Sequence, residues 1–214
     1  MKSELKLAKR SELHLMRRFW HLFCGVVCLI SYYSFSFEAK TWAIVALIVA
    51  SLGFILDFRR LKSPELNEFL TKCFGPIMRR SEKYSFSGLP FYALGASLSL
   101  FLFKEEIAIL AISFLIFADP AASIAGVYLG RDRLFPNKTL QGTITAFLVC
   151  FIVCLVYFWL NNIQSPNIII FAFFGSIIGA LSELLSAFNI DDNLTIPVVS
   201  GAALSAFNYW LLIF

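Results

Sequence analysis

Long uninterrupted apolar stretches dominate this chain and restrict it to folds that exist in lipid. A transmembrane helix needs about 20 mostly apolar residues to cross a hydrocarbon core of roughly 30 Å. Seven stretches approach or reach this length: Phe19–Phe37, Thr41–Phe58, Leu89–Phe103, Ile107–Leu129, Thr143–Leu160, Ile168–Leu185 and Ile196–Phe214. Only 15% of the residues are charged and 59% are hydrophobic, whereas soluble domains carry about 25% charged residues. We therefore predict an all-α, polytopic integral membrane protein with about seven transmembrane helices, forming a single domain over residues 1–214.

The basic residues predict which end of each helix lies in the cytoplasm. Short loops rich in lysine and arginine remain on the cytoplasmic side of a membrane. With seven spans, all but two of the 18 basic residues fall on the side of the N terminus, and only Lys40 and Lys104 fall on the other side. We therefore predict a cytoplasmic N terminus. The net charge of +4 then reflects topology and attraction to anionic headgroups, which argues against nucleic acid as a partner.

The longest polar segment, residues 59–87, is predicted to be a cytoplasmic loop that contains an interfacial helix. Ser63, Pro64 and Glu65 suit the N-cap, the first helical position and the first turn of a helix. The apolar residues that follow recur at steps of three and four: Leu66, Phe69, Leu70, Cys73, Phe74 and Ile77. Such an amphipathic helix lies in the membrane interface, and we expect Pro76 to interrupt it. Alternatively, the basic residues beyond it are only headgroup anchors.

Two acidic residues lie inside predicted spans and indicate a function. A carboxylate within a span usually faces the protein interior or a water-filled cavity, and Asp119 and Glu183 both qualify. Pro120 cannot donate a backbone hydrogen bond, so we expect a helix break that lets Asp119 cap a second half-helix. Small residues at steps of three and four accompany both acids: Ser123, Gly126 and Gly130 after Asp119, and Gly175 and Gly179 before Glu183. Helix packing alone would explain the small residues but not the carboxylates.

A basic segment after the first acid fits an anion site. It contains Arg131, Lys138 and Thr139, and Gly142 and Thr143 open the fifth apolar helix. The free N–H groups of a helix N-terminus, together with hydroxyls and a lysine, suit a phosphate group. The G-x-x-x-x-G-K-[ST] pattern of P-loop proteins is absent, so an ordinary P-loop fold is excluded.

A further polar cluster, Asp191, Asp192 and Asn193, precedes the last span on the same predicted side. Mg²⁺ prefers one or two carboxylates together with substrate phosphates. Asp119, Glu183 and the acids of this cluster, beside a phosphate-binding segment, therefore suggest Mg²⁺-assisted chemistry on a nucleotide.

The stretch ADPAASIAGVYLGRDRLFPNKTLQGTITAF resembles the signature of the polyprenol, dolichol, phytol and CTP-dependent diacylglycerol kinase family. That signature joins a G-D-P-x-A-S-x-x-G-x-x-x-G run to a K-S/T-x-x-G-S/T motif. Three further pieces resemble the family in the same order: ELHLMRRFWHLFCG, LDFRRLKSPELNEF with MRRSEKYSFSG, and SELLSAFNIDDNLTIPVVSG. Ala118 departs from the pattern, because the family usually has glycine before the aspartate. The family is distantly similar to phosphatidate cytidylyltransferases.

The resemblance implies transfer of a γ-phosphoryl group, from CTP in preference to ATP, to a membrane lipid alcohol such as diacylglycerol or a polyprenol. It implies Mg²⁺ as cofactor, held by Asp119, Glu183 and Asp191, and catalysis by Asp119, Lys138 and Asp57. The implied nucleotide contacts are Ser123, Gly126, Gly130, Arg131, Lys138, Thr139, Gly142, Thr143, Asp192 and Asn193. The implied contacts to the lipid or its phosphate are His21, Arg18, Arg59, Arg79 and Glu82. The site would face the cytoplasm, in a cell inner membrane.

Some of these residues have a structural alternative. Asp57 ends the second span beside two arginines, so an interfacial ion pair is the alternative to a role in activating the lipid hydroxyl. His14, Arg17, Arg18 and His21 share one helix face that would contact the nucleotide or headgroup. A hydrogen-bonded interfacial histidine is the alternative explanation of each histidine.

Two other functions compete with a lipid kinase. A cytidylyltransferase would make a CDP-lipid and release pyrophosphate, whereas the kinase would release CDP. An ion-coupled transporter would use the intramembrane acids, but it should show repeated architecture, and no convincing internal repeat is present. The residues leave open the acceptor alcohol, CTP against ATP, and the oligomeric state.

Overall fold

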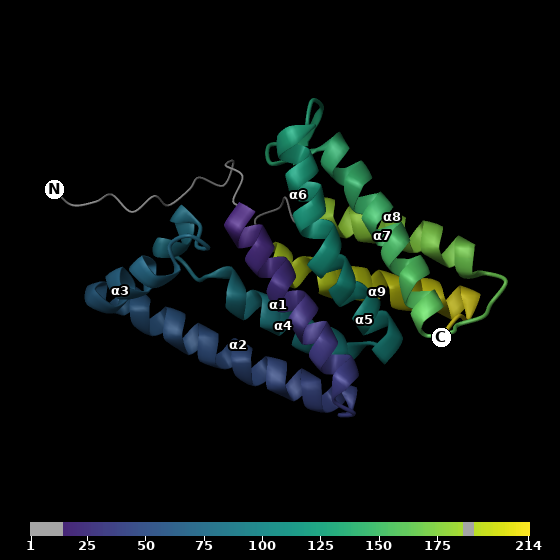
Figure 1. Ribbon diagram of the computed structural model, residues 1–214, viewed down its shortest axis with the longest axis horizontal. Helices are drawn as coiled ribbons and strands as arrows, with labels where there is room; N and C mark the ends of the chain where they lie inside the picture. The colour runs from purple at the N-terminus through teal and green to yellow at the C-terminus, as the bar shows by residue number, and fades with distance from the viewer. Residues whose placement is uncertain (1–14, 186–190) are drawn as a thin grey trace.

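The structure, a computed structural model, describes residues 15–185 and 191–214 and consists almost entirely of helices (Figure 1). The helices are α1 (Leu15–Ser34), α2 (Ala39–Lys62), α3 (Pro64–Phe74), α4 (Gly88–Leu102), α5 (Glu105–Ser113), α6 (Asp119–Tyr128), α7 (Leu140–Leu160), α8 (Ile168–Leu185) and α9 (Asp192–Leu211). A π turn, Phe114–Ala118, joins α5 to α6, and a 3₁₀ turn, Arg80–Lys83, precedes α4. These elements confirm the predicted all-α class.

Five helical segments of the described chain are long and apolar enough to cross a membrane: α2, the α5–α6 segment (Glu105–Tyr128), α7, α8 and α9. Helix α4 is also apolar but has only 15 residues, in agreement with the short third span. Helix α1 carries Arg17, Arg18 and His21 in its first two turns and is not among the five. The chain is therefore a polytopic membrane protein, while the count of seven spans and the orientation of the N terminus stay predictions.

The helix predicted within the long polar loop is present as α3, which lies at the C-terminal end of α2 (Figure 1). Ser63 is its N-cap and accepts a hydrogen bond from the N–H of Leu66 at 3.4 Å, and Pro64 is its first residue. Phe69 and Phe74 are 61% and 48% exposed, as apolar side chains of an interfacial helix would be before lipid covers them.

The segment from α5 through the π turn to α6 is the centre of the fold. It contacts α1, α4, α7, α8 and α9, and 72% of its apolar window is buried, against 44% or less in the other four candidate spans. Leu110, Phe114, Leu115 and Ile116 on this segment are all fully buried. Because so many helices surround it, polar groups near its C-terminal end can meet polar groups from several other elements.

The predicted helix break at Asp119 was wrong. The backbone stays in the right-handed helical region through Ala118 and Asp119, and Ala118, not Asp119, occupies the N-cap position of α6. In a π turn each carbonyl pairs with the N–H five residues later, and for Leu115 that residue is Pro120, which has no N–H. The Leu115 carbonyl instead accepts a hydrogen bond from His21 Nε2 at 3.1 Å. A side chain of α1 thus replaces the missing donor, and the helix continues.

A close approach of α4 and α9 requires the glycine at position 95. A Cβ atom there would collide with the carbonyl oxygen of Asn193 and lie 3.2 Å from the Cα of Leu194. Both neighbours are backbone atoms, which cannot rotate away. Gly95 therefore fixes the start of α9 against the middle of α4.

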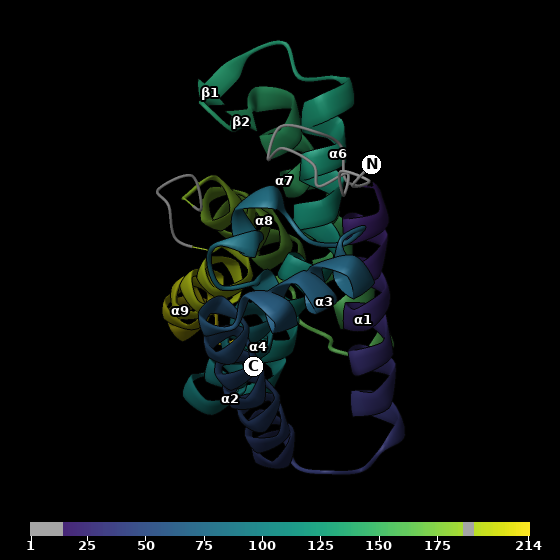
Figure 2. The same ribbon diagram turned by 90° about the vertical axis from the view of Figure 1, so that its left-hand side faces the viewer.

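A small hairpin, which the sequence analysis did not predict, lies between α6 and α7. Strand β1 (Arg133–Phe135) pairs antiparallel with β2 (Lys138–Thr139), and the connecting Pro136-Asn137 is a typical turn dipeptide. Figure 2 shows the hairpin beyond the ends of α6 and α7, away from the α1–α2 connection. It delivers Lys138 to the start of α7, which begins at Leu140, before the predicted Thr143.

We expect Gly95→Ala to destabilise the protein by about 1–3 kcal/mol, because the added methyl group overpacks a backbone contact. Gly175→Ala is the matched control: a Cβ there would meet only side chains, the nearest being Leu204 at 3.3 Å. Both substitutions gain the same helix propensity, so the difference isolates the collision. Thermal unfolding of the purified protein in detergent measures it. Equal midpoints would contradict the assigned packing of α4 on α9.

Candidate functional site

Lys138 and Glu183 form a buried ion pair at the centre of the candidate site. Lys138 Nζ contacts Glu183 Oε1 directly, and the two side chains are only 14% and 4% exposed. The pair joins the hairpin to the last turn of α8. A predicted phosphate-binding lysine and a predicted metal-binding acid therefore lie side by side.

Thr139 caps α7 and fills the space beside Gly126 of α6 and Gly130, two residues beyond the end of α6. Its Oγ1 accepts a hydrogen bond from the N–H of Gly142 at 3.1 Å, and its carbonyl oxygen accepts one from Thr143 Oγ1 at 3.2 Å. A Cβ atom on Gly126 would lie 3.1 Å from Thr139 Oγ1, and one on Gly130 would contact Thr139 Cγ2. The small residues thus bring α6 against the N-terminus of α7, as the packing alternative predicted.

The segment around Arg131 is held to the first turn of α7 by Gln141. Gln141 Oε1 accepts hydrogen bonds from the backbone N–H groups of Arg131 and Asp132 at 3.0 and 3.3 Å, and its Nε2 donates to Asp132 Oδ2 at 2.8 Å. The Arg131 side chain remains exposed. Sequence reasoning missed Gln141, although its place inside the signature was a usable signal.

A chain of charged groups connects α1, the 3₁₀ turn and the start of α9. Arg17 Nη1 contacts Glu82 Oε1 at 2.5 Å, and Glu82 Oε2 accepts a hydrogen bond from the backbone N–H of Arg79 at 3.1 Å. The Arg79 guanidinium then faces Asp192 at 3.4 Å and Asp191 at 3.9 Å. Glu82 and Arg79, predicted as lipid or phosphate contacts, therefore lie beside the predicted nucleotide and metal acids.

Asn193 ties this chain of charges to α4. Its Nδ2 donates to Asp191 Oδ1 at 2.8 Å and to the carbonyl oxygen of Gly88 at 3.3 Å. A Cβ atom on Gly88 would lie 2.8 Å from both Asn193 Nδ2 and Arg17 Nη2. A residue with a side chain at position 88 would therefore displace the ends of the Arg17 and Asn193 side chains.

The pKa values of the loop residues reflect the close approach of these arginines and acids. Burial opposes the Arg79 cation, but Asp192 and Asp191 outweigh it and raise the pKa of Arg79. Burial and the neighbouring Asp192 raise the pKa of the Asp191 carboxyl to about 6, while Arg79 acts against them. Asp191 and Asp192 thus lie close enough to repel each other even with Arg79 beside them, so an additional cation would reduce this repulsion.

Asp119 is a half-buried acid that lies among these charged groups. Its carboxylate interacts electrostatically with Arg18, Arg79 and Glu183. Arg18 Nη1 donates to the carbonyl oxygen of Pro120, next to Asp119, at 3.4 Å. Ser123 lies half-buried one turn further along α6. Among the described residues no hydrogen bond or ion pair engages the Asp119 carboxylate, so it can bind a ligand.

The three predicted metal ligands do not form a ready-made cage. No group of three His, Cys, Asp or Glu side chains able to hold a metal ion occurs within the described ranges. Glu183 faces Lys138, while Asp191 caps α9 through the N–H of Asn193 at 3.0 Å. Mg²⁺ needs only one or two carboxylates when phosphates supply its other ligands. Asp119 near these acids fits that requirement.

Asp57 forms the structural ion pair that was the alternative to a catalytic role. It is 5% exposed, and Arg60, 2% exposed, donates to its Oδ1 at 2.5 Å. Its Oδ2 accepts hydrogen bonds from the N–H and Oγ of Ser87 at 2.7 and 2.8 Å. Arg60 also donates to the carbonyl oxygen of Ser85 at 2.7 Å. With both oxygens engaged, Asp57 positions the loop before α4.

Of the remaining predicted headgroup contacts, one side chain is hydrogen-bonded within the protein and another is exposed. His21 is satisfied by Leu115, as the structural alternative stated, and packs edge-on against Tyr92 with ring centroids 4.7 Å apart. Arg59 is exposed, and its side chain makes no hydrogen bond or ion pair within the part of the chain that the structure describes. His14 lies outside the described residues.

Comparisons with known proteins place the chain in a family. It is 33% identical over 170 residues to the CTP-dependent diacylglycerol kinase 1 of Schizosaccharomyces pombe, covering 73% of this chain and 78% of that protein. The chain belongs to the CTP-dependent diacylglycerol kinase family. It is 28% identical over 210 residues to the Saccharomyces cerevisiae protein of the same name, covering 89% of this chain and 72% of that protein.

This diacylglycerol kinase family membership confirms the predicted resemblance. The chain is also 33% identical over 175 residues to an uncharacterised protein of Rickettsia prowazekii, covering 79% of this chain and 83% of that protein. No family model matches the chain, and no solved structure matches it. The segments that resemble the family signature converge in space, because Arg18 lies against Pro120, Lys138 pairs with Glu183, and Arg79 faces Asp192.

Tyr92 is a residue of this family member that sequence reasoning missed. Its hydroxyl is buried and has no hydrogen-bond partner within the described structure. It is close to Gly25, where a Cβ atom would collide with it, and its ring contacts His21. Nothing in the spacing of apolar residues on α4 distinguishes Tyr92 from an ordinary lipid-facing aromatic residue.

We expect Asp57→Asn to destabilise the protein by about 3 kcal/mol or more, because it leaves the buried Arg60 cation without its anion. Glu38→Gln, at an exposed acid whose side chain makes no capping hydrogen bond to α2, is the control. Thermal unfolding and limited proteolysis at residues 83–87 measure the effect. Loss of lipid-kinase activity at an unchanged unfolding midpoint would instead assign Asp57 a direct part in the chemistry.

Proposed function

We propose that this protein transfers the γ-phosphoryl group of CTP to the hydroxyl of diacylglycerol. The observation that carries the proposal is the 33% identity to the S. pombe protein named CTP-dependent diacylglycerol kinase 1. The similar S. cerevisiae and Eremothecium gossypii proteins carry the same name, which favours CTP over ATP and diacylglycerol over a polyprenol. We further propose that residues 1–214 form one lipid-kinase domain.

The basic groups of the site suit the triphosphate. Phosphoryl transfer depends mainly on positioning and on neutralising charge on the phosphate oxygens. An ammonium has three donors, so Lys138 can contact a phosphate oxygen while it stays beside Glu183. Arg18 and Arg79 add positive charge on the α1 and loop sides of Asp119. The N-terminus of α7 at Thr139 supplies backbone N–H groups, with Ser123, Gly126, Gly130, Arg131, Gly142 and Thr143 around it.

Asp119 is the carboxylate proposed to hold Mg²⁺. It is half-buried, interacts electrostatically with Arg18 and Glu183, and forms no hydrogen bond or ion pair among the described residues. Bound Mg²⁺ would neutralise phosphate charge and orient the triphosphate. Glu183 and Asp191 are proposed as its outer neighbours, since Lys138 and Arg79 already face them. Asp192 and Asn193 contact Arg79 and α4 beside the same candidate site.

The acceptor hydroxyl requires orientation more than a strong base, because the transition state of phosphoryl transfer is loose. Of the two acids predicted to activate the hydroxyl, Asp57 has both oxygens engaged. Asp119 is therefore the acid proposed to lie beside the reacting groups. The basic residues near it, Arg17, Arg18 and Arg79, support a site on the cytoplasmic face of a cell inner membrane.

Phosphate transfer from γ-labelled CTP or ATP to a lipid alcohol tests the proposal. We expect purified protein with Mg²⁺ to convert diacylglycerol and CTP into labelled phosphatidate and CDP, at least tenfold faster than with ATP or undecaprenol. EDTA should abolish transfer, and added Mg²⁺ should restore it. Release of pyrophosphate with formation of a CDP-lipid would replace the kinase by a cytidylyltransferase. Preferred labelling of undecaprenol would change the acceptor.

We expect Asp119→Asn and Lys138→Ala each to reduce label transfer by about 10²–10³-fold or more, because each removes charge that acts on the phosphates. Lys138→Ala also removes the cation that faces the buried Glu183. The double variant Lys138→Ala/Glu183→Gln removes both charges and keeps the fold, yet should remain inactive. Glu38→Gln and Lys40→Ala, both exposed and at the start of α2, serve as controls. Undiminished transfer would remove the substituted residue from the site.

A further inference from the structure

An open groove lies between α2, α3 and the start of α4, apart from the candidate site. Its volume is about 960 Å³, and most of its lining is apolar. Phe54 packs edge-on against Phe86 and Phe91 with ring centroids 5.6 and 5.2 Å apart, so part of the wall is a fixed aromatic cluster. Such a surface is well suited to an acyl chain.

Two cations lie at one end of this groove. Arg59 and Lys62 are exposed, line the groove, and lie one turn apart on α2. Lys62 Nζ lies 4.1 Å from the centroid of the Phe58 ring, a cation–π contact that holds the ammonium over the aromatic wall. No acidic residue lines the groove, and neither cation forms an ion pair within the described chain.

Arg60, between them in sequence, shows the contrast. It is 2% exposed, points inward and pairs with Asp57. The same helix end therefore has one arginine whose charge is neutralised inside the protein and two cations whose charge is available outside. An anion beside Arg59 and Lys62 would neutralise these two exposed charges.

The position on α2 restricts the nature of that anion. Helix α2 is a candidate membrane span, and only 17% of its apolar window is buried in the protein, so lipid covers its outer face. A ligand that combines an acyl chain with a phosphate matches both the apolar wall and the cations. A soluble anion would leave the aromatic wall unused.

We propose that this groove binds an anionic phospholipid of the surrounding bilayer, with an acyl chain along the phenylalanine wall and its phosphate between Arg59 and Lys62. Phe86 in the groove precedes Ser87, which donates to Asp57, and follows Ser85, whose carbonyl accepts from Arg60. A lipid packed on Phe86 therefore stabilises the loop that leads from Arg79 and Glu82 to α4. This inference does not depend on the proposed kinase activity.

Native mass spectrometry of the purified full-length protein in detergent tests the groove. Phosphatidylglycerol, phosphatidate and phosphatidylcholine with identical acyl chains are titrated separately. We expect phosphatidylglycerol to bind at least tenfold more tightly than phosphatidylcholine and to raise the unfolding midpoint. Arg59→Gln and Lys62→Gln should each weaken its binding roughly fivefold, and the double variant about twentyfold, given the usual attraction per basic residue near anionic lipid.

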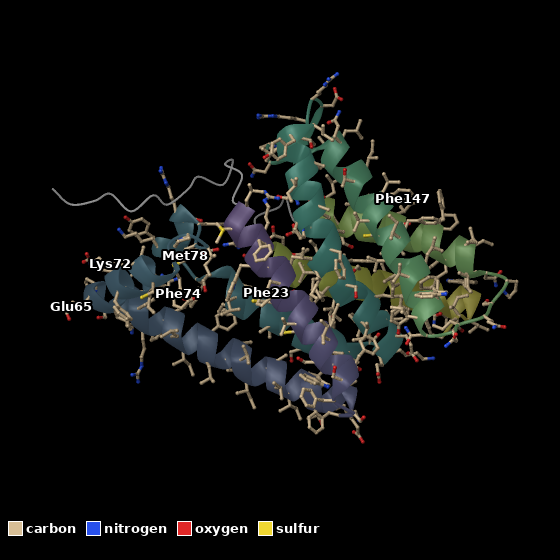
Figure 3. All side chains as sticks on the ribbon, in the orientation of Figure 1. Phe23, Glu65, Lys72, Phe74, Met78 and Phe147 are labelled. Carbon is tan, nitrogen blue, oxygen red and sulfur yellow. The ribbon has the colours of Figure 1, made fainter. Side chains whose placement is uncertain are left out.

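Two further variants distinguish attraction to surface charge from binding in the groove. Lys72 lies in the last turn of α3 (Figure 3) and pairs with Glu68 at 3.1 Å, so Lys72→Gln should leave lipid binding unchanged. Ile55→Trp fills the groove without altering charge and should weaken binding of phosphatidylglycerol and phosphatidylcholine alike.

Three results would overturn the proposal. The first is an unchanged preference for phosphatidylglycerol in the Arg59→Gln/Lys62→Gln variant. The second is an equal loss in Lys72→Gln, which would mean unspecific surface attraction. The third is binding of phosphatidate more than tenfold tighter than phosphatidylglycerol, which would make the groove a site for a lipid phosphomonoester instead of a bilayer diester.

Discussion

Pro120 removes one backbone donor from the central helix, and a side chain of α1 compensates for it. The π turn before the proline presents the Leu115 carbonyl to His21. This hydrogen bond holds α1 against the centre of the fold, together with the contact of His21 with Tyr92. Arg18, one turn earlier on α1, consequently lies beside Pro120 and Asp119. The position of Arg17 near Glu82 and Gly88 follows from the same alignment.

The ion pairs around this centre determine geometry more than stability. Burying a charge is costly, and a buried pair often contributes little net free energy, although losing one partner is expensive. Each pair here joins segments distant in sequence: Arg17 with Glu82, Arg79 with Asp192, and Lys138 with Glu183. Phosphoryl transfer demands such fixed charge positions. The low dielectric of the surroundings also strengthens the interaction of these groups with a phosphate.

Sequence patterns predicted the features that depend on neighbours along the chain. The apolar runs gave the helical class, and Ser63-Pro64 gave the start of α3. The patterns could not decide between a helix break and a π turn at Pro120, because the deciding donor, His21, lies on another helix. The patterns also could not decide whether Asp57 acts in catalysis or in an ion pair, because Ser87, which binds its second oxygen, comes from a distant loop. Family resemblance supplied the candidate site residues, whereas the contacts between them required the fold.

The basic run at the end of α2 illustrates why a list of charges does not define a site. Successive helical residues point about 100° apart, so Arg59, Arg60 and Lys62 cannot all reach one ligand. Arg60 enters the protein and holds the loop, while Arg59 and Lys62 remain outside above the phenylalanine groove. The end of α2 therefore has one charge that the protein uses internally, to hold the loop before α4, and two that remain available to a ligand outside.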